Sequence, residues 1–180
     1  RFDVDEMISR FNSPEQKRID LRKAMNTRPD DTYLKKGIAQ LTNIQEVRRS
    51  ASQGMFISYT RSDELFAFNL MESLSSQGLR AWLDMTDVDE EEEWHVAVKA
   101  ALKRSGLMLA VMSPHALTDP AVNAEREFFA EQGKLVLPVI YKKCDMGGTR
   151  YWLMPIDFSH DFELGIYTLT LLLHDTYAKK

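Results

Sequence analysis

The sequence contains a single cysteine, Cys144, among its 180 residues. One thiol cannot form a disulfide within the chain, and it stands alone without the paired cysteines of a zinc site. The histidines are also scattered without the spacing of metal ligands; they are His95, His115, His160 and His174. We therefore expect no metal site.

Long apolar runs and glycine-rich motifs are missing as well. No run approaches the roughly 20 apolar residues that a membrane span needs, and no signal-peptide pattern opens the chain. We therefore expect a cytoplasmic protein without membrane contact. The eight glycines never form a GxGxxG or phosphate-loop pattern, which argues against a Rossmann dinucleotide site and against a nucleoside triphosphatase. The chain begins at Arg1 rather than Met, as a piece of a longer protein would.

Residues 54–84 have the pattern of a strand, a helix and a second strand. The apolar run 55–57 is too short for a helix, and the polar stretch after it ends in residues that favour a helix N-cap. A helix is predicted over 63–77 and a strand over 79–83. The apolar residues at mostly helical spacing in this predicted helix are Leu65, Phe66, Leu70 and Leu74. Short connections of this kind require a parallel strand pair with a right-handed crossover.

The same unit repeats along the rest of the chain. Further helices are predicted over residues 94–102, 123–132 and 164–177, and further strands over residues 107–112, 135–140 and 155–158. Gly78, Gly106 and Gly133 each lie between a helix and a strand, where glycine commonly ends a helix. The pattern predicts an α/β fold with an open, doubly wound parallel sheet.

Residues 1–53 differ from the remainder, because they contain no strand-like run. Ser13 and Pro14 favour a helix start, and a second predicted helix covers residues 32–41; residues 43–50 are compatible with a third helix or a linker. The segment has 11 Lys and Arg against 8 Asp and Glu, whereas the rest has 12 against 19. We predict a helical N-terminal segment over residues 1–53 and a second domain over residues 54–180. The mixed charges of the N-terminal segment do not predict nucleic-acid binding.

Open parallel sheets bind their ligands at the carboxyl ends of the strands. Three segments are predicted to converge there: residues 59–63, 84–93 and 113–125. Ser113 follows a predicted strand but lacks the GxSxG elbow of a nucleophilic serine. We expect it to cap a turn with Pro114.

Several blocks occur in an order that is similar to one known family. They are FISYTRSDE, GLRAWLD, SGLMLAVMSPHAL, GKLVLPVI and MPIDFSHDFELGIYTLTLLL. Together they resemble a Toll/interleukin receptor (TIR) domain of the bacterial kind, over residues 54 to about 178. The resemblance implies a flavodoxin-like, open parallel five-stranded sheet with strand order 2-1-3-4-5, flanked by helices. It does not cover the first 50 residues.

The TIR resemblance implies one of two activities. Many bacterial members cleave NAD at the nicotinamide-ribose bond, using a glutamate in a pattern like W-V-x-x-E that precedes a Gly-Lys pair by eight residues. Here Glu125 matches the glutamate, Gly133 follows it at that distance, and Ala121 stands where the pattern has tryptophan. Glu127 is the second candidate. Other members are non-enzymatic scaffolds that act through TIR-TIR contacts, and this alternative stays open.

NAD is thus the expected substrate, and no cofactor is expected. A carboxylate is suited to this cleavage because it stabilises the oxocarbenium-like ribose left when nicotinamide departs. The residues expected to contact substrate are Tyr59, Arg61, Asp84, Trp94 and Ser113. Tyr59 and Trp94 match aromatic positions of the family near the site, and Arg61 is interpreted as a partner of the acidic loop or of a substrate phosphate.

The loop after the second predicted strand is acidic. Its carboxylates are Asp84, Asp87, Asp89, Glu90, Glu91, Glu92 and Glu93. They suit a solvated helix N-terminus, but they would also repel the pyrophosphate of NAD. We therefore predict that this loop contacts a basic partner surface, such as Lys142 and Lys143 or the N-terminal helices. The resemblance implies a homo-oligomer in which one chain completes the pocket of the next, acting in bacterial defence or cell death.

Overall fold

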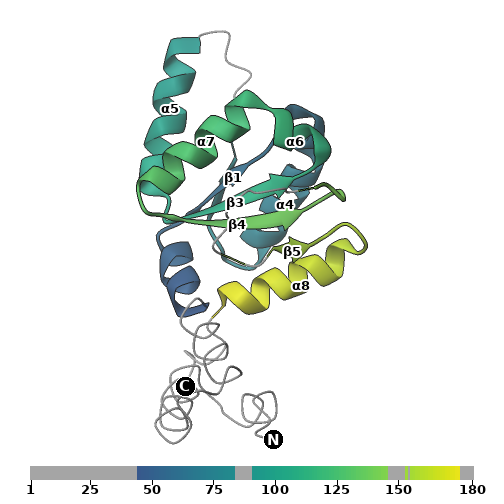
Figure 1. Cartoon of the computed structure of the whole chain (residues 1–180). Helices are drawn as coiled ribbons and strands as arrows, with labels where there is room; N and C mark the ends of the chain where they lie inside the picture. The colour runs from purple at the N-terminus through teal and green to yellow at the C-terminus, as the bar shows by residue number, and fades with distance from the viewer. Residues whose placement is uncertain (1–43, 84–90, 146–152, 154, 175–180) are drawn as a thin grey trace, which may run out of the picture.

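The computed structural model describes residues 44–83, 91–145, 153 and 155–174. In this part of the chain, five strands form one parallel sheet in the order β2-β1-β3-β4-β5 (Figure 1). The strands are β1 (Met55–Ser58), β2 (Ala81–Leu83), β3 (Leu107–Met112), β4 (Leu135–Ile140) and β5 (Ile156–Asp157). The predicted flavodoxin-like fold and strand order are confirmed.

Helices alternate with the strands and cover both faces of the sheet (Figure 1). Between and after the strands, the helices are η1 (Arg61–Asp63), α4 (Glu64–Ser76), α5 (Glu91–Arg104), α6 (Pro114–Thr118), α7 (Pro120–Glu131) and α8 (Phe162–Leu173). Residues 44–52 are helical as well. The sequence did not predict α6 as a helix, and it placed the start of α7 three residues too late. The predicted helices before residue 42 lie outside the described residues, as does Tyr177 at the predicted end of the last helix.

Strand β3 shows why its sequence is a continuous apolar run. Leu107, Leu109 and Val111 pack into a cluster with α4 and α8 on one face of the sheet. The intervening residues, Met108 and Ala110 among them, pack with α5 and α7 on the other face. Because successive side chains of a strand point to opposite faces, a strand covered on both sides must be apolar throughout.

Helix α4 corrects one detail of the sequence prediction. Phe66, Leu70 and Leu74 are buried as expected, but Leu65 is 75% exposed. Each residue turns about 100° around a helix axis, so the neighbour of Phe66 points away from the stripe that Phe66, Leu70 and Leu74 share. Leu65 therefore does not belong to the core.

Residues 44–52 pack closely onto the sheet domain. Val47 and Ala51 are buried in the same cluster as α4 and α8. A Cβ atom added to Gly106 would lie 2.2 Å from the backbone oxygen of Ser50, so a glycine is needed where this helix approaches the sheet. Gly106 has no positive φ, unlike Gly78 and Gly133. The boundary near residue 53 stays a prediction, but the helix before it shares the core.

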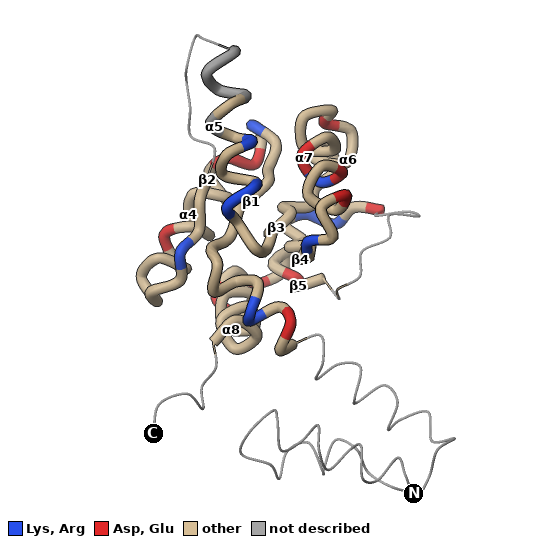
Figure 2. Tube along the Cα trace, turned by 90° about the vertical axis from the view of Figure 1, so that its left-hand side faces the viewer, with Lys and Arg blue, Asp and Glu red and all other residues tan. Residues whose placement is uncertain are grey.

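Charged residues surround the three central strands of the sheet rather than enter them. β1, β3 and β4 contain no Lys, Arg, Asp or Glu, and Figure 2 shows the coloured charged positions on helices and loops around these strands. Among the residues that the structure describes, no helix is both long and apolar enough to span a bilayer.

Candidate functional site

The side chains at the carboxyl edge of the sheet include the glutamate that the sequence singled out. Ser58 is the last residue of β1 and pairs with Ala110 on β3. Its side chain is buried, and its hydroxyl donates a hydrogen bond of 2.7 Å to Oε2 of Glu125. Glu125 is half-buried. The hydrogen bond places the carboxylate of α7 where β1 ends, which is the edge at which open parallel sheets bind ligands.

The start of α7 determines where Glu125 lies. The carboxylate of Asp119 accepts hydrogen bonds from the backbone N–H groups of Ala121 (2.9 Å) and Val122 (3.4 Å), and Pro120 occupies the first turn. An Asp N-cap followed by proline is a strong helix start. Glu125 consequently lies in the second turn, near the end of α7 that meets the carboxyl edge of the sheet.

Arg126 is a buried cation next to Glu125 that was not predicted from the sequence. Only 8% of the residue is exposed, and its guanidinium lies 3.5 Å from the sulfur of Met112 and donates to Oδ1 of Asn123. The spacing of Val122, Arg126 and Phe129 is i, i+4, i+7, and all three are buried. This spacing was a readable signal that Arg126 lies on the buried stripe of the helix.

A second polar group, here called the Asp63 cluster, consists of Asp63, Ser113 and Lys142. The Ser113 hydroxyl donates to Oδ2 of Asp63, and Nζ of Lys142 lies 3.4 Å from Oδ1. The Asp63 side chain is fully buried, whereas that of Lys142 is 47% exposed. A buried carboxylate is stable only when it is paired. The cluster therefore links the segments that follow β1, β3 and β4.

The Asp63 cluster contains two residues for which the sequence predicted a capping role. Asp63 is the N-cap residue of α4, yet its carboxylate makes no capping hydrogen bond. Ser113 is completely buried and accepts a hydrogen bond of 3.1 Å from the backbone N–H of Ala116, at the start of α6. The predicted capping role of Ser113 with Pro114 is confirmed. A contact of Ser113 with substrate stays a prediction.

The remaining candidates of the described chain lie around the same edge. Tyr59 directly follows Ser58, is half-buried and packs against the core cluster of α4 and α8. Arg61 opens η1 and is exposed. Glu127 is exposed on α7, two residues beyond Glu125, so the two carboxylates point in different directions around the helix axis. The structure thus brings Glu125 and not Glu127 to Ser58.

Several predicted residues are not placed. Asp84, Asp87, Asp89 and Glu90 lie outside the described residues. The residues of the first turns of α5 are described for their backbone alone; they are Glu91, Glu92, Glu93 and Trp94. The substrate and interface roles of these residues stay predictions.

Two further observations concern the chemistry of the described residues. No group of three or more His, Cys, Asp and Glu side chains in this part of the chain is arranged to hold a metal ion. At the end of β5, the proximity of Ser159 lowers the pKa of the Asp157 carboxyl, whose Oδ1 accepts a hydrogen bond of 2.8 Å from the backbone N–H of Ser159. This carboxylate thus adds negative charge to the carboxyl edge.

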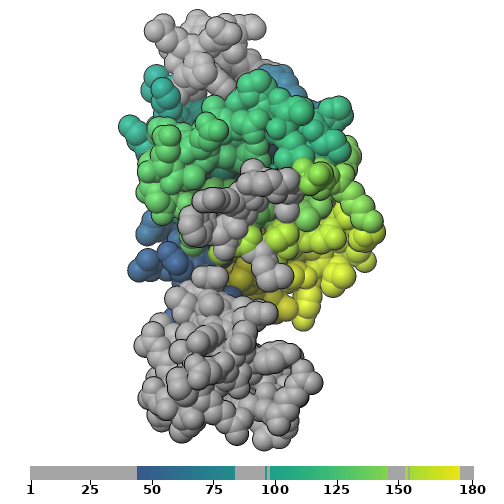
Figure 3. All heavy atoms as spheres, viewed as in Figure 1, coloured from purple at the N-terminus to yellow at the C-terminus, as the bar shows by residue number. Residues whose placement is uncertain are grey.

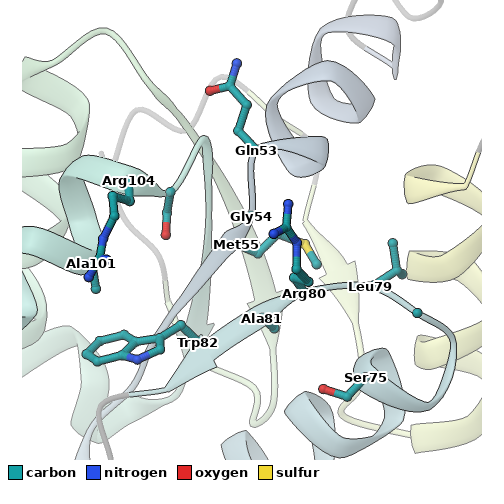
Figure 4. A pocket seen from close by; sticks show the side chains of 12 residues that line it. Gln53, Gly54, Met55, Ser75, Leu79, Arg80, Ala81, Trp82, Ala101 and Arg104 are labelled. Atoms are coloured by element: carbon teal, nitrogen blue, oxygen red, sulfur yellow. The ribbon is translucent and has the colours of Figure 1, made fainter.

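A groove of about 560 Å³ lies at the opposite edge of the sheet (Figure 4). It is lined by the start of β1, the start of β2 and the end of α5, including Arg80, Trp82 and Arg104. Parallel strands place all their amino ends at one edge and all their carboxyl ends at the other. The groove is therefore separate from the site around Glu125.

These features define the class of the molecule: an open flavodoxin-like α/β domain with a hydrogen-bonded carboxylate at its carboxyl edge. A family model described as TIR domain matches residues 55–170 of the sequence. The chain belongs to the TIR domain family, as its sequence blocks predicted.

A solved structure shows the same fold. The chain is similar to the crystal structure of the TIR domain of the Toll-related receptor TRR-2 from Hydra magnipapillata, with a TM-score of 0.55 and 16% sequence identity. The match covers 65% of this chain and 93% of that chain. At this identity the likeness concerns the fold alone. No curated protein matches the chain significantly.

Proposed function

We propose that this TIR domain cleaves NAD at the nicotinamide-ribose bond, with Glu125 as the catalytic carboxylate. The observation that carries the proposal is the hydrogen bond from the Ser58 hydroxyl to Glu125. It fixes a carboxylate at the edge of the sheet where α/β folds bind ligands. NAD cleavage is also one of the two activities that the family resemblance implies.

The cleavage needs one carboxylate to stabilise positive charge on the ribose and one nucleophile to replace nicotinamide. When the bond between ribose C1′ and the pyridinium nitrogen breaks, its electrons leave with nicotinamide, which departs neutral, and positive charge develops on the ribose. The carboxylate of Glu125 would stabilise this charge. Water then forms the new bond to C1′ and releases a proton to give a linear product, or a nitrogen of the adenine ring forms the bond to give a cyclic product. A carboxylate that is oriented before the substrate binds stabilises the developing charge more than a mobile carboxylate does.

Neighbouring residues suit the rest of the substrate. Tyr59 follows Ser58 and offers an aromatic ring, and the exposed Arg61 offers a cation to the pyrophosphate. The acidic loop that begins at Asp84 would be compensated by contact with another copy of the chain. We therefore propose activation by self-assembly, in a cytoplasmic defence or cell-death pathway of bacteria. Lys142 is a weaker docking point for that loop than the sequence suggested, because it already pairs with Asp63.

The test is nicotinamide release from NAD by concentrated protein, with assembly monitored by light scattering. We expect Glu125→Ala and Glu125→Gln to lower the rate on the order of a hundred- to thousandfold. Glu127→Ala is the matched control on the same helix and should leave the rate unchanged. Release that survives the loss of Glu125 would assign the carboxylate to another residue.

A non-enzymatic TIR scaffold is the second candidate. The observation that favours it is the run of seven carboxylates within residues 84–93, which repels an anionic dinucleotide. A sample that assembles but releases no nicotinamide would support the scaffold. In that case, charge reversal over residues 90–93 should prevent assembly.

A further inference from the structure

Helix α8 is apolar on two faces, and only one of them is packed. Ile166, Leu169 and Leu173 are buried in the core cluster. On the other side, Leu164 is 61% exposed, Tyr167 62% and Leu171 45%. These three residues have the spacing i, i+3, i+7, so they form one stripe along the helix. We call this stripe the outer face of α8.

The outer face is unusual for a helix at a protein surface. Single exposed apolar residues are common, but a contiguous apolar stripe marks a surface that contacts something else. In Figure 3 the atoms of α8, in yellow, form part of the visible surface of the molecule. A surface helix normally carries polar residues on the side away from the core.

The position of residues 44–52 indicates what covers this face. Arg48 donates hydrogen bonds to the backbone oxygens of Leu171 (3.0 Å) and Leu172 (2.9 Å), at the last turn of α8. The chain that precedes residue 44 therefore joins the domain next to one end of the outer face. This preceding segment is 43 residues long, more than enough to extend along a helix of 12 residues.

The sequence just before residue 44 has a matching stripe. Leu34, Ile38 and Leu41 fall at i, i+4, i+7 within the helix predicted over residues 32–41. Leu34 and Leu41 are seven positions apart, as are Leu164 and Leu171, which is about 10 Å in either helix.

Two further features of the sequence favour this pairing. Asn43 is a favourable N-cap for a new helix, so the chain has a place to change direction before residue 44. Lys35 and Lys36 also lie in the predicted helix, and Glu163 is exposed at the start of α8. The two segments are thus complementary in charge as well as in apolar spacing.

We propose that residues 32–42 form a helix that packs parallel to α8, with Leu41 over Leu171 and Leu34 over Leu164. The direction follows from the connection, because the segment must end beside the last turn of α8. This interface would fix the orientation of the TIR domain relative to the N-terminal segment. It does not depend on the proposed NAD chemistry.

The test is cross-linking within the full chain. In a Cys144→Ser background, Ile38→Cys and Tyr167→Cys are combined and treated with a short bis-maleimide. The control pair is Ile38→Cys with Glu131→Cys, because Glu131 is exposed at the end of α7 on the other face of the sheet. Circular dichroism verifies that each variant folds. The intramolecular product is quantified by peptide mass spectrometry.

We expect about tenfold more intramolecular product from the test pair, because a packed helix holds two thiols together and a flexible tether does not. Leu41→Asp, added to the test pair, should remove this excess. Equal yields from the two pairs would overturn the proposal. A product that is only dimeric and grows with protein concentration would also overturn it, since the outer face would then bind a second copy.

Discussion

The hydrogen bond between Ser58 and Glu125 is accessible to a quantitative test that does not depend on catalysis. Ser58→Ala removes the hydroxyl from a residue that is 1% exposed and lies 2.7 Å from a carboxylate oxygen. Hydrogen bonds to charged groups contribute about 1.5–3 kcal/mol to the free energy of unfolding. Glu125 is only half-buried, so water would replace part of the bond. We therefore expect Ser58→Ala to lower the free energy of unfolding by about 1.5 kcal/mol.

A double-mutant cycle measures this value directly. The free energy of unfolding is determined in urea for the wild type, Ser58→Ala, Glu125→Ala and the double variant. The coupling energy between the two positions should be about 1–1.5 kcal/mol. In thermal unfolding, a loss of this size lowers the Tm of a chain of this length by roughly 2–6 °C.

Glu127→Ala is the matched control for the cycle. It removes an exposed carboxylate from the same helix, and it should change the free energy of unfolding by less than about 0.5 kcal/mol. Coupling between Ser58 and Glu125 that is zero within about 0.3 kcal/mol would refute their contact. The position of Glu125 at the end of β1 would then lose its support.

Three further predictions concern other parts of the fold. Lys134→Met removes three hydrogen bonds of 2.8–2.9 Å to backbone oxygens at the end of α5, and it should lower the free energy of unfolding in urea by about 1.5–3 kcal/mol. Gly106→Ala places a methyl group against the Ser50 oxygen and should cost about 1–3 kcal/mol in the same assay. Burial and the nearby Asp145 raise the pKa of the Cys144 thiol; since the thiolate is the reactive form, its alkylation should be slower than that of a free thiol at neutral pH and should accelerate as the pH rises. A rate independent of pH would contradict this.

The sequence predicted the central strands better than the helix starts, for a physical reason. The bounds of β3 and β4 agree with the prediction at both ends, because a strand buried on both faces is a continuous apolar run between polar or glycine residues. The start of α7 was predicted at Asn123 rather than Pro120. The stretch before it has no apolar periodicity, and the stronger signal was the Asp119 and Pro120 pair.

The site could be predicted only in part. Glu125 was identified from a pattern within one helix, but its partner Ser58 lies 67 residues earlier. No local feature of Ser58 distinguishes it from other serines that end strands. The same holds for the Asp63 cluster, whose members come from three separate segments. Contacts of this kind depend on strand order, which local periodicity does not encode.

The Gly-Lys pair that helped to locate Glu125 has a structural meaning of its own. Gly133 adopts a φ of 69° just after α7, and the Lys134 ammonium donates to three backbone oxygens at the end of α5. α7 therefore spans the sheet from the edge with Glu125 to the edge with Lys134. The eight residues from Glu125 to Gly133 correspond to about 12 Å of helix. The spacing in the family pattern thus reflects the length of α7 between Glu125 and Gly133. This length keeps the carboxylate at one edge of the sheet, while the lysine contacts the end of α5 at the other edge.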